Sequence, residues 1–251
     1  MADPMIEHLV ALHRGLPRQG PGDTASTQKA LELCAGLPSA SQILDIGCGS
    51  GAQTLVLAEA TQGTVTGVDL HDAILQGLTD EAARRGLTAR VKAVRGDMTA
   101  LPFPEESFDL LWSEGAIYIM GFDAGLDAWR PLLRAGGCLA VTELSWLTPN
   151  PPAEASAFWA EGYPAMRSIE ANLAGAEAAG FEVVGHFVLP ARTWTDEYYG
   201  PLAARLDPYL AEHPGDAVAE AVVAGTREEI AMYERFGDTY GYVFYVLRRS
   251  D

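Results

Sequence analysis

Hydrophobic and polar positions along the chain alternate between short apolar runs and longer amphipathic stretches. The short runs predict strands, and apolar residues at helical spacing predict the helices between them. The predicted strands lie near 42–46, 64–69, 90–95, 108–113, 138–143, 181–188 and 241–248. The predicted helices between them lie near 51–60, 72–85, 122–134 and 168–179. Alternation of this kind predicts an α/β fold, with a mostly parallel sheet and helices on both of its faces.

Two stretches, 144–167 and 189–239, exceed the usual connection length of about 4–6 residues. Each begins where a predicted strand ends, and the first is rich in Pro, Trp and Tyr. Helical spacing of apolar residues also occurs within the second stretch and before the first strand. These further helices are predicted near 5–16, from Ser26 to Leu37, and near 196–212 and 216–236.

These assignments predict a single domain over residues 1–251. Its core covers about 40–188 and 240–251. The N-terminal helices in 1–38 and the insertion 189–239 are interpreted as an α-helical cap, although the N-terminal pair is equally well explained as packing helices.

A glycine-rich turn follows the first predicted strand, where Gly47, Gly49 and Gly51 alternate with other residues. Glycine permits positive φ and lets a ligand approach the backbone closely. The helix that follows presents unpaired N–H groups at its N-terminus. The turn therefore predicts a cradle for a nucleotide-type ligand. Gly47, Gly49 and Ala52 also satisfy a dinucleotide fingerprint, so the glycines alone do not identify the ligand.

Acidic residues end five successive predicted strands, namely Asp45, Asp69, Asp97, Glu114 and Glu143. Open α/β sheets bind ligands outside the carboxyl ends of their strands. We therefore expect these acids to lie along one rim of the sheet. Asp69, about 20 residues past the glycine turn, suits hydrogen bonds to ribose hydroxyls. Asp97 is alternatively a helix N-cap.

The pattern Asp45-x-Gly47-x-Gly49-x-Gly51 resembles motif I of the class I S-adenosylmethionine (SAM) methyltransferases. An acid at position 45 would repel a dinucleotide pyrophosphate and attract the ammonium of an amino-acid-bearing cofactor. The stretch 101–109 resembles the lead-in to the fourth strand of the ubiquinone-biosynthesis-type members, and the resemblance covers about 40–145. It implies a Rossmann-like, seven-stranded, mostly parallel sheet whose last strand is antiparallel, with SAM as cofactor.

The resemblance also implies which residues bind and react. The expected cofactor-binding residues are Asp45, Gly47, Cys48, Gly49, Gly51, Asp69, Leu70, Asp97, Met98 and Ser113. Among them, Asp97 is expected to bond the adenine amino group, with Leu70 and Met98 on the two faces of the ring. The candidate catalytic residues are Glu114, Tyr118 and His71.

Each catalytic candidate has a second interpretation. Glu114 orients or deprotonates the acceptor, bonds the SAM ammonium, or merely ends a strand. Tyr118 is a proton donor, a weak base or a packed aromatic residue. His71 is a general base or a surface residue at a helix start.

These features predict transfer of a methyl group from SAM to a small-molecule acceptor by in-line displacement. The stretch 112–122 departs from the N/D-P-P-Y motif, which counts against methylation of DNA or of glutamine. Methylation on O, N, C or S all remain open. The alternatives are an NAD(P)-dependent oxidoreductase and a non-catalytic SAM-binding protein.

Composition limits the classes of partner and the cellular location that we expect. A net charge of −17 disfavours nucleic acid and anionic lipid surfaces as partners. We expect no membrane association, because no apolar run approaches the roughly 18–20 residues of a membrane span. Three scattered cysteines and the absence of a signal-peptide pattern favour a cytoplasmic location. No metal is expected, and a homodimer is left open.

Overall fold

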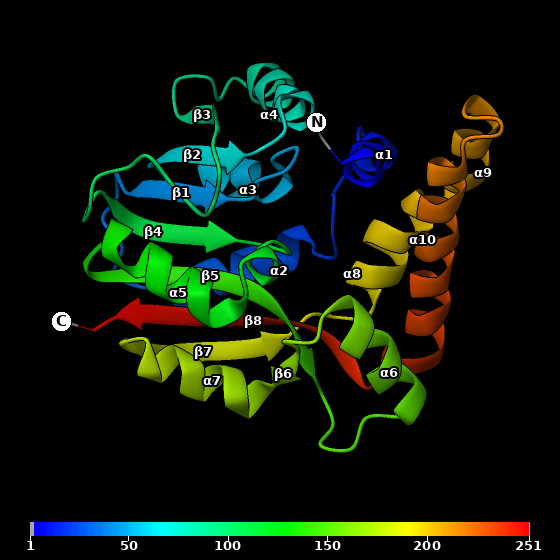
Figure 1. Cartoon of the computed structure of the whole chain (residues 1–251). Coiled ribbons are helices and arrows are strands. Elements are labelled where there is room, and N and C mark those ends of the chain that lie inside the picture. Colours follow the sequence, from blue (N-terminus) through cyan, green and yellow to red (C-terminus); the bar gives the residue numbers. More distant parts are fainter. Residues whose placement is uncertain (1–2, 251) are drawn as a thin grey trace.

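The computed structural model describes residues 3–250, which form an α/β structure around one sheet (Figure 1). The strands are β1 (Gln42–Ile46), β2 (Thr64–Asp69), β3 (Val91–Arg95), β4 (Phe108–Ser113), β5 (Leu133–Trp146), β6 (Arg167–Ser168), β7 (Phe181–Val188) and β8 (Tyr240–Arg249). The strand order is β3-β2-β1-β4-β5-β8-β7, and β6 pairs with β5. Only β8 runs antiparallel to its neighbours, β5 and β7. The seven expected strands are therefore confirmed. The two-residue β6 is additional, because so short a pairing leaves no periodicity in the sequence.

Helices and short helical turns alternate with these strands. The α-helices are α1 (Pro4–His13), α2 (Thr24–Leu33), α3 (Ala52–Ala60), α4 (Asp72–Arg84), α5 (Phe122–Trp129), α6 (Ala153–Gly162), α7 (Ile169–Ala178), α8 (Arg192–Trp194), α9 (Gly200–Glu212) and α10 (Ala217–Phe236). The turns are η1 (Ile117–Ile119), η2 (Arg130–Leu132) and a π-helical turn, η3 (Thr195–Tyr199). The helix expected at 122–134 ends earlier, because Leu133 already pairs with Phe108 as the start of β5.

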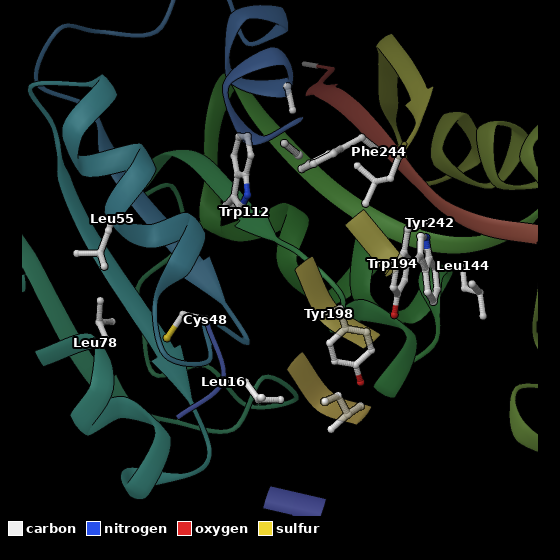
Figure 2. Packing of buried hydrophobic residues seen from close by; sticks show 14 of the residues in the cluster. Leu16, Cys48, Leu55, Leu78, Trp112, Leu144, Trp194, Tyr198, Tyr242 and Phe244 are labelled. Carbon is white, nitrogen blue, oxygen red and sulfur yellow. The ribbon is translucent and has the colours of Figure 1, made fainter. Parts of the chain in front are cut away.

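The two faces of the sheet are covered by different helices. One apolar cluster joins Ile43, Leu110 and Phe244 of the strands to α2, α3 and α4, and Figure 2 shows Leu55 of α3 beside Leu78 of α4. A second cluster joins the opposite face to α5 and α7. Buried strands with apolar residues on both faces are typical of parallel sheets between helical layers. Among residues 3–250, every helix is too short or too polar to cross a lipid bilayer.

The helices α1, α6, α8, α9 and α10 lie beyond the carboxyl ends of the parallel strands (Figure 1). Helix α1 contacts α9 and α10, whereas α2 contacts α3 and β8 and so lies on the sheet. Of the two N-terminal helices, only α1 therefore accompanies the insertion. We propose that α1, α6 and α8–α10 form the cap.

Aromatic stacking and hydrogen bonds attach the cap to the core. Trp194 of α8 stacks on Tyr242 of β8 and on Tyr233 of α10, with ring centroids 5.1 and 4.6 Å apart (Figure 2). His8 Nδ1 of α1 lies 2.8 Å from the Tyr209 hydroxyl of α9. The Trp194–Tyr242 contact thus joins the cap to β8, whereas the contacts to Tyr233 and Tyr209 hold the cap helices together.

Candidate functional site

The glycine turn between β1 and α3 is approached closely by neighbouring residues that also line the adjoining cavity. Gly47 and Gly49 have φ of +70° and +57°, a region that favours glycine. A Cβ on Gly47 would lie 2.4 Å from the Ala116 Cβ, and one on Gly49 would lie 2.5 Å from Gln19 Oε1. Side chains at these two positions would therefore fill the cradle.

A cavity of about 530 Å³ opens beside this turn, in front of the first four strand ends. Seven of the expected cofactor-binding residues line it: Gly47, Cys48, Gly49, Asp69, Leu70, Asp97 and Met98. The three catalytic candidates, His71, Glu114 and Tyr118, line it as well. Most of the exposed large apolar side chains of residues 3–250 also gather there, namely Ile6, Leu9, Leu70, Tyr118 and Ile119. The cavity therefore combines backbone polar groups with apolar walls, as ligand sites commonly do.

The acids at the ends of β2 and β3 both line the cavity but have different hydrogen-bond partners. Asp69 accepts hydrogen bonds from Gly49 N at 3.1 Å and His71 N at 3.0 Å, so it links the glycine turn to the start of α4. Asp97 is exposed, and hydrogen bonds from the Thr99 hydroxyl and N–H hold the pKa of its carboxyl below the usual range. Both carboxyl groups thus place acceptor oxygens at the wall of the cavity.

Three expected cofactor-binding residues do not line the cavity. Asp45 is fully buried behind the turn and accepts hydrogen bonds from Thr54 at 2.5 Å and Gln53 at 3.3 Å. Burial raises the pKa of Asp45 to about 7, although those hydrogen bonds oppose the rise. Ser113 is also buried and donates to the Ile46 carbonyl, and a Cβ on Gly51 would meet Leu78. The expectation that Asp45 faces the ligand is therefore not met. The three residues hold strand, turn and helix together.

Glu114 faces the cavity with both carboxylate oxygens occupied. Its Oε1 accepts from Thr27 Oγ1 at 2.7 Å and Trp112 Nε1 at 2.9 Å, and its Oε2 accepts from Arg18 Nη1 at 3.0 Å. The two charged side chains are 3% and 10% exposed, so the ion pair is poorly screened by water. Glu114 thereby attaches the segment between α1 and α2 to the end of β4.

The segment between α1 and α2 is held at a second point by Gln19. Its Oε1 accepts from Ser50 N at 2.8 Å, and its Nε2 donates to the Leu16 carbonyl at 3.2 Å. Arg18 and Gln19 both line the cavity. No pattern in the sequence indicated Arg18 or Gln19, because they lie in a turn without periodicity.

A second chamber, of about 280 Å³, lies between the strand ends and the cap. Seven aromatic side chains line it: Tyr118, Phe158, Trp159, Tyr163, Trp194, Tyr198 and Tyr242. It shares Gln19, Gly20, Pro21, Gly115 and Tyr118 with the first cavity. Tyr118 therefore stands at the boundary between the two chambers, and His71 lines only the first.

Two acids lie in or beside the second chamber. Glu229 of α10 lines it, and its Oε1 accepts from the Tyr199 hydroxyl at 2.8 Å. Glu143 of β5 accepts from the hydroxyl of Tyr163, a lining residue, at 2.6 Å. Burial raises the pKa of Glu143 to about 7 and also raises the pKa of Glu229. Of the five rim acids, Asp69, Asp97 and Glu114 thus face the first cavity, and Glu143 adjoins the second chamber.

Glu229 was also missed, although the sequence holds a signal for it. Residues Val222, Thr226, Glu229 and Tyr233 recur at helical spacing, and the other three are buried. An acid on the buried face of an amphipathic helix is unusual and indicates either a paired charge or a site. Among residues 3–250, no group of three or more His, Cys, Asp or Glu side chains is arranged to hold a metal ion.

Comparisons with known proteins agree with this geometry. Residues 43–137 match the family model described as a methyltransferase domain. The sterol 24-C-methyltransferase erg-4 of Neurospora crassa is 27% identical over 204 residues, covering 75% of this chain and 53% of that protein. The 27-O-demethylrifamycin SV methyltransferase of Amycolatopsis mediterranei is 30% identical over 137 residues, covering 51% and 48%. The chain thus spans about half the length of these curated relatives.

A solved structure resembles the whole chain. A SAM-dependent methyltransferase from Geobacter sulfurreducens, in complex with S-adenosyl-L-homocysteine, superposes with a TM-score of 0.78. It is 21% identical, and the match covers 98% of both chains. At this identity the likeness concerns the fold, which is the fold expected from the glycine turn and the strand order.

Proposed function

We propose that the chain is a class I SAM-dependent methyltransferase and that it transfers a methyl group from SAM to a small-molecule acceptor. The observation that carries this proposal is the pair of adjoining chambers that share Tyr118. One is walled by a glycine turn and acids, and the other by aromatic rings. Two adjoining chambers suit a two-substrate reaction in which one chamber holds the donor and the other the acceptor.

We assign the donor to the first cavity. Asp69 would bond the ribose hydroxyls, and Leu70 and Met98 would hold the adenine ring, with Asp97 at its amino group. Arg18 is a lining cation whose guanidinium already binds Glu114, and its remaining N–H groups suit the cofactor carboxylate. The glycine turn fits the cofactor, because Gly47 and Gly49 line the cavity and have no side chains that would reduce its volume.

The chemistry that SAM supplies when bound is a methyl group already activated on a sulfonium. The protein's residues then have to align the acceptor and exclude water. Tyr118 is the candidate for alignment, because its ring stands between the chambers. Glu114 is a less suitable base than expected, since three donors already occupy its oxygens. We therefore propose that Glu114 positions Arg18 and the α1–α2 segment.

His71 remains a candidate at the edge of the first cavity. It is the N-cap residue of α4, and its backbone N–H donates to Asp69. Its side chain lies away from the aromatic chamber and therefore suits contact with the donor better than proton transfer from the acceptor.

A cytoplasmic location and the absence of nucleic acid from the partners belong to the same proposal. The three cysteines are buried free thiols, which is compatible with a reducing compartment. The charge of −17 supports an acceptor other than nucleic acid. Pairing of two copies into a homodimer stays an expectation.

The test has two stages. Calorimetry with S-adenosylhomocysteine measures cofactor binding, and incubation with methyl-labelled SAM and fractionated metabolites measures transfer. We expect both binding and label incorporation. Binding without transfer to any fraction would favour the non-catalytic SAM-binding alternative. Binding of NAD in place of S-adenosylhomocysteine would contradict the proposal.

A further inference from the structure

The aromatic chamber has a distinctly negative electrostatic character. Apart from tyrosine hydroxyls, Glu229 is the single ionisable side chain among the described residues that line it, and none of these is Lys, Arg or His. Desolvation within the site and then the nearby charges of Glu229 and Glu143 raise the pKa of Tyr118, although the residue is 40% exposed. The same two acids act in the same direction on Tyr242. A ligand in this chamber therefore meets rings and negative charge.

Both acids have an unused oxygen. Glu229 accepts one hydrogen bond, from Tyr199, and within residues 3–250 no cation offsets its burial. Glu143 accepts from Tyr163 through Oε1, while its Oε2 is buried without a hydrogen-bond partner in the described part of the chain. A buried carboxylate without a compensating charge is unfavourable, and a cation placed nearby relieves that cost.

We propose that the aromatic chamber recognises a positively charged nitrogen of the methyl acceptor, a protonated or quaternary amine, between its aromatic rings and Glu229. This inference rests on the proposed function, because it takes the chamber to be the acceptor site. The faces of Trp and Tyr rings attract cations through their quadrupoles. Trp159, Trp194 and Tyr198 supply such rings, and Glu229 supplies the opposite charge.

A neutral acceptor fits these observations less well. A hydroxyl group could donate one hydrogen bond to Glu229, but it would leave the carboxylate without a counter-charge. An anionic acceptor would face Glu229 directly, with no lining cation to receive it. An amine satisfies both features of the chamber, the rings and the acid. The acceptor class that follows is a small amine.

The test compares a cation with a neutral molecule of nearly the same shape. Choline and 3,3-dimethylbutan-1-ol are titrated calorimetrically into the protein saturated with S-adenosylhomocysteine. We expect choline to bind about tenfold more tightly or better, since the two probes differ mainly in charge. Glu229→Gln should remove most of that preference and leave the affinity for the alcohol unchanged. Glu228→Gln, the neighbouring exposed acid of α10, is the matched control.

A second variant tests the rings independently of the acid. Trp159→Leu should lower choline affinity severalfold while S-adenosylhomocysteine still binds, which also verifies folding. Equal affinity for the two probes, no measurable binding of either, or a preference that survives Glu229→Gln would overturn the inference. Normal S-adenosylhomocysteine binding in those cases would leave the proposed function standing. Conversely, a protein that prefers choline but does not bind S-adenosylhomocysteine would contradict the proposed function instead.

Discussion

The two chambers of the site differ in how the chain builds them. Most of the first cavity comes from short segments that directly follow β1, β2, β3 and β4, each containing residues close together in the sequence. The second chamber combines residues that lie far apart, from Gln19 through Tyr118 and Trp159 to Glu229 and Tyr242. Strand-end turns thus form the proposed donor side, and packing of the cap forms the proposed acceptor side.

The acids of the two chambers differ in the same way. Asp69 and Asp97 accept hydrogen bonds from nearby backbone N–H groups, and Asp97 is exposed. Glu143 and Glu229 are surrounded by tyrosines, and burial raises the pKa of each. Local turns therefore determine the proposed cofactor site, whereas the proposed acceptor site depends on tertiary packing. Variants should therefore separate the two functions.

The largest effect is expected from Asp69→Ala. The change removes the carboxylate proposed to hold the ribose and leaves Gly49 N and His71 N without their acceptor. Each charge-assisted hydrogen bond is worth roughly 1.5–3 kcal/mol, so S-adenosylhomocysteine affinity should fall about 100-fold or more. Calorimetry measures it, with the exposed Asp72→Ala as control. Unchanged affinity would show that Asp69 is not a cofactor ligand.

Gly47→Ala is expected to weaken cofactor binding about tenfold or more. Its new Cβ would lie 2.4 Å from the Ala116 Cβ, so the turn has to shift toward the cavity. Gly86→Ala is a matched control, because Gly86 has φ +69° against +70° for Gly47 but nothing within 4 Å of its Cβ. Both variants should lose about 1 kcal/mol or more of unfolding free energy. Equal cofactor affinities in the two variants would mean that the contact between the new Cβ and Ala116 does not affect cofactor binding.

The sequence predicted the sheet and brought out most of the strand-end residues that line the first cavity, because periodicity and turn chemistry are local properties. The prediction that the Asp45 carboxylate faces the ligand was not met. Asp45 directly precedes the glycine turn, but its side chain accepts hydrogen bonds from Thr54 and Gln53. The direction in which a strand-end side chain points depends on what packs against it. No pattern along the chain reports that.

The acceptor side could be predicted only in outline. The cap aromatics were recognisable as a group, but Trp194 meets Tyr242 only after α8 and β8 have packed together. Arg18 lies in a turn and acquires its place through Glu114, 96 residues later in the chain. Such long-range contacts leave no trace in local spacing.

Glu143→Gln tests whether a costly buried charge adjoins the second chamber. Its pKa of about 7 in the folded protein lies above the unfolded value of about 4.3, so the native state keeps a proton that the unfolded state has released. Stability is therefore lost as pH rises from about 4.3 through 7. Glu143→Gln removes that loss and should be more stable than the parent protein by about 1–2 kcal/mol at pH 8 but not at pH 4.5. Urea unfolding at both pH values measures this.

The exposed Glu182→Gln variant is the control and should show no such pH-dependent gain in stability. An identical pH profile of stability for Glu143→Gln and the parent protein would argue against a buried charge.

The smallest effect is expected from Glu114→Gln, and it decides between two roles for this carboxylate at the first cavity. A general base contributes roughly 10²–10⁴ to the rate, so its loss would be obvious. A carboxylate whose oxygens already accept from Arg18, Thr27 and Trp112 serves instead to hold Arg18.

The glutamine variant keeps one acceptor oxygen but loses the charge. We therefore expect methyl transfer at saturating SAM to fall less than about tenfold. Cofactor affinity should fall about threefold, and amide exchange over 14–23 should rise. A rate loss of a hundredfold or more with unchanged exchange over 14–23 would instead assign Glu114 to proton transfer.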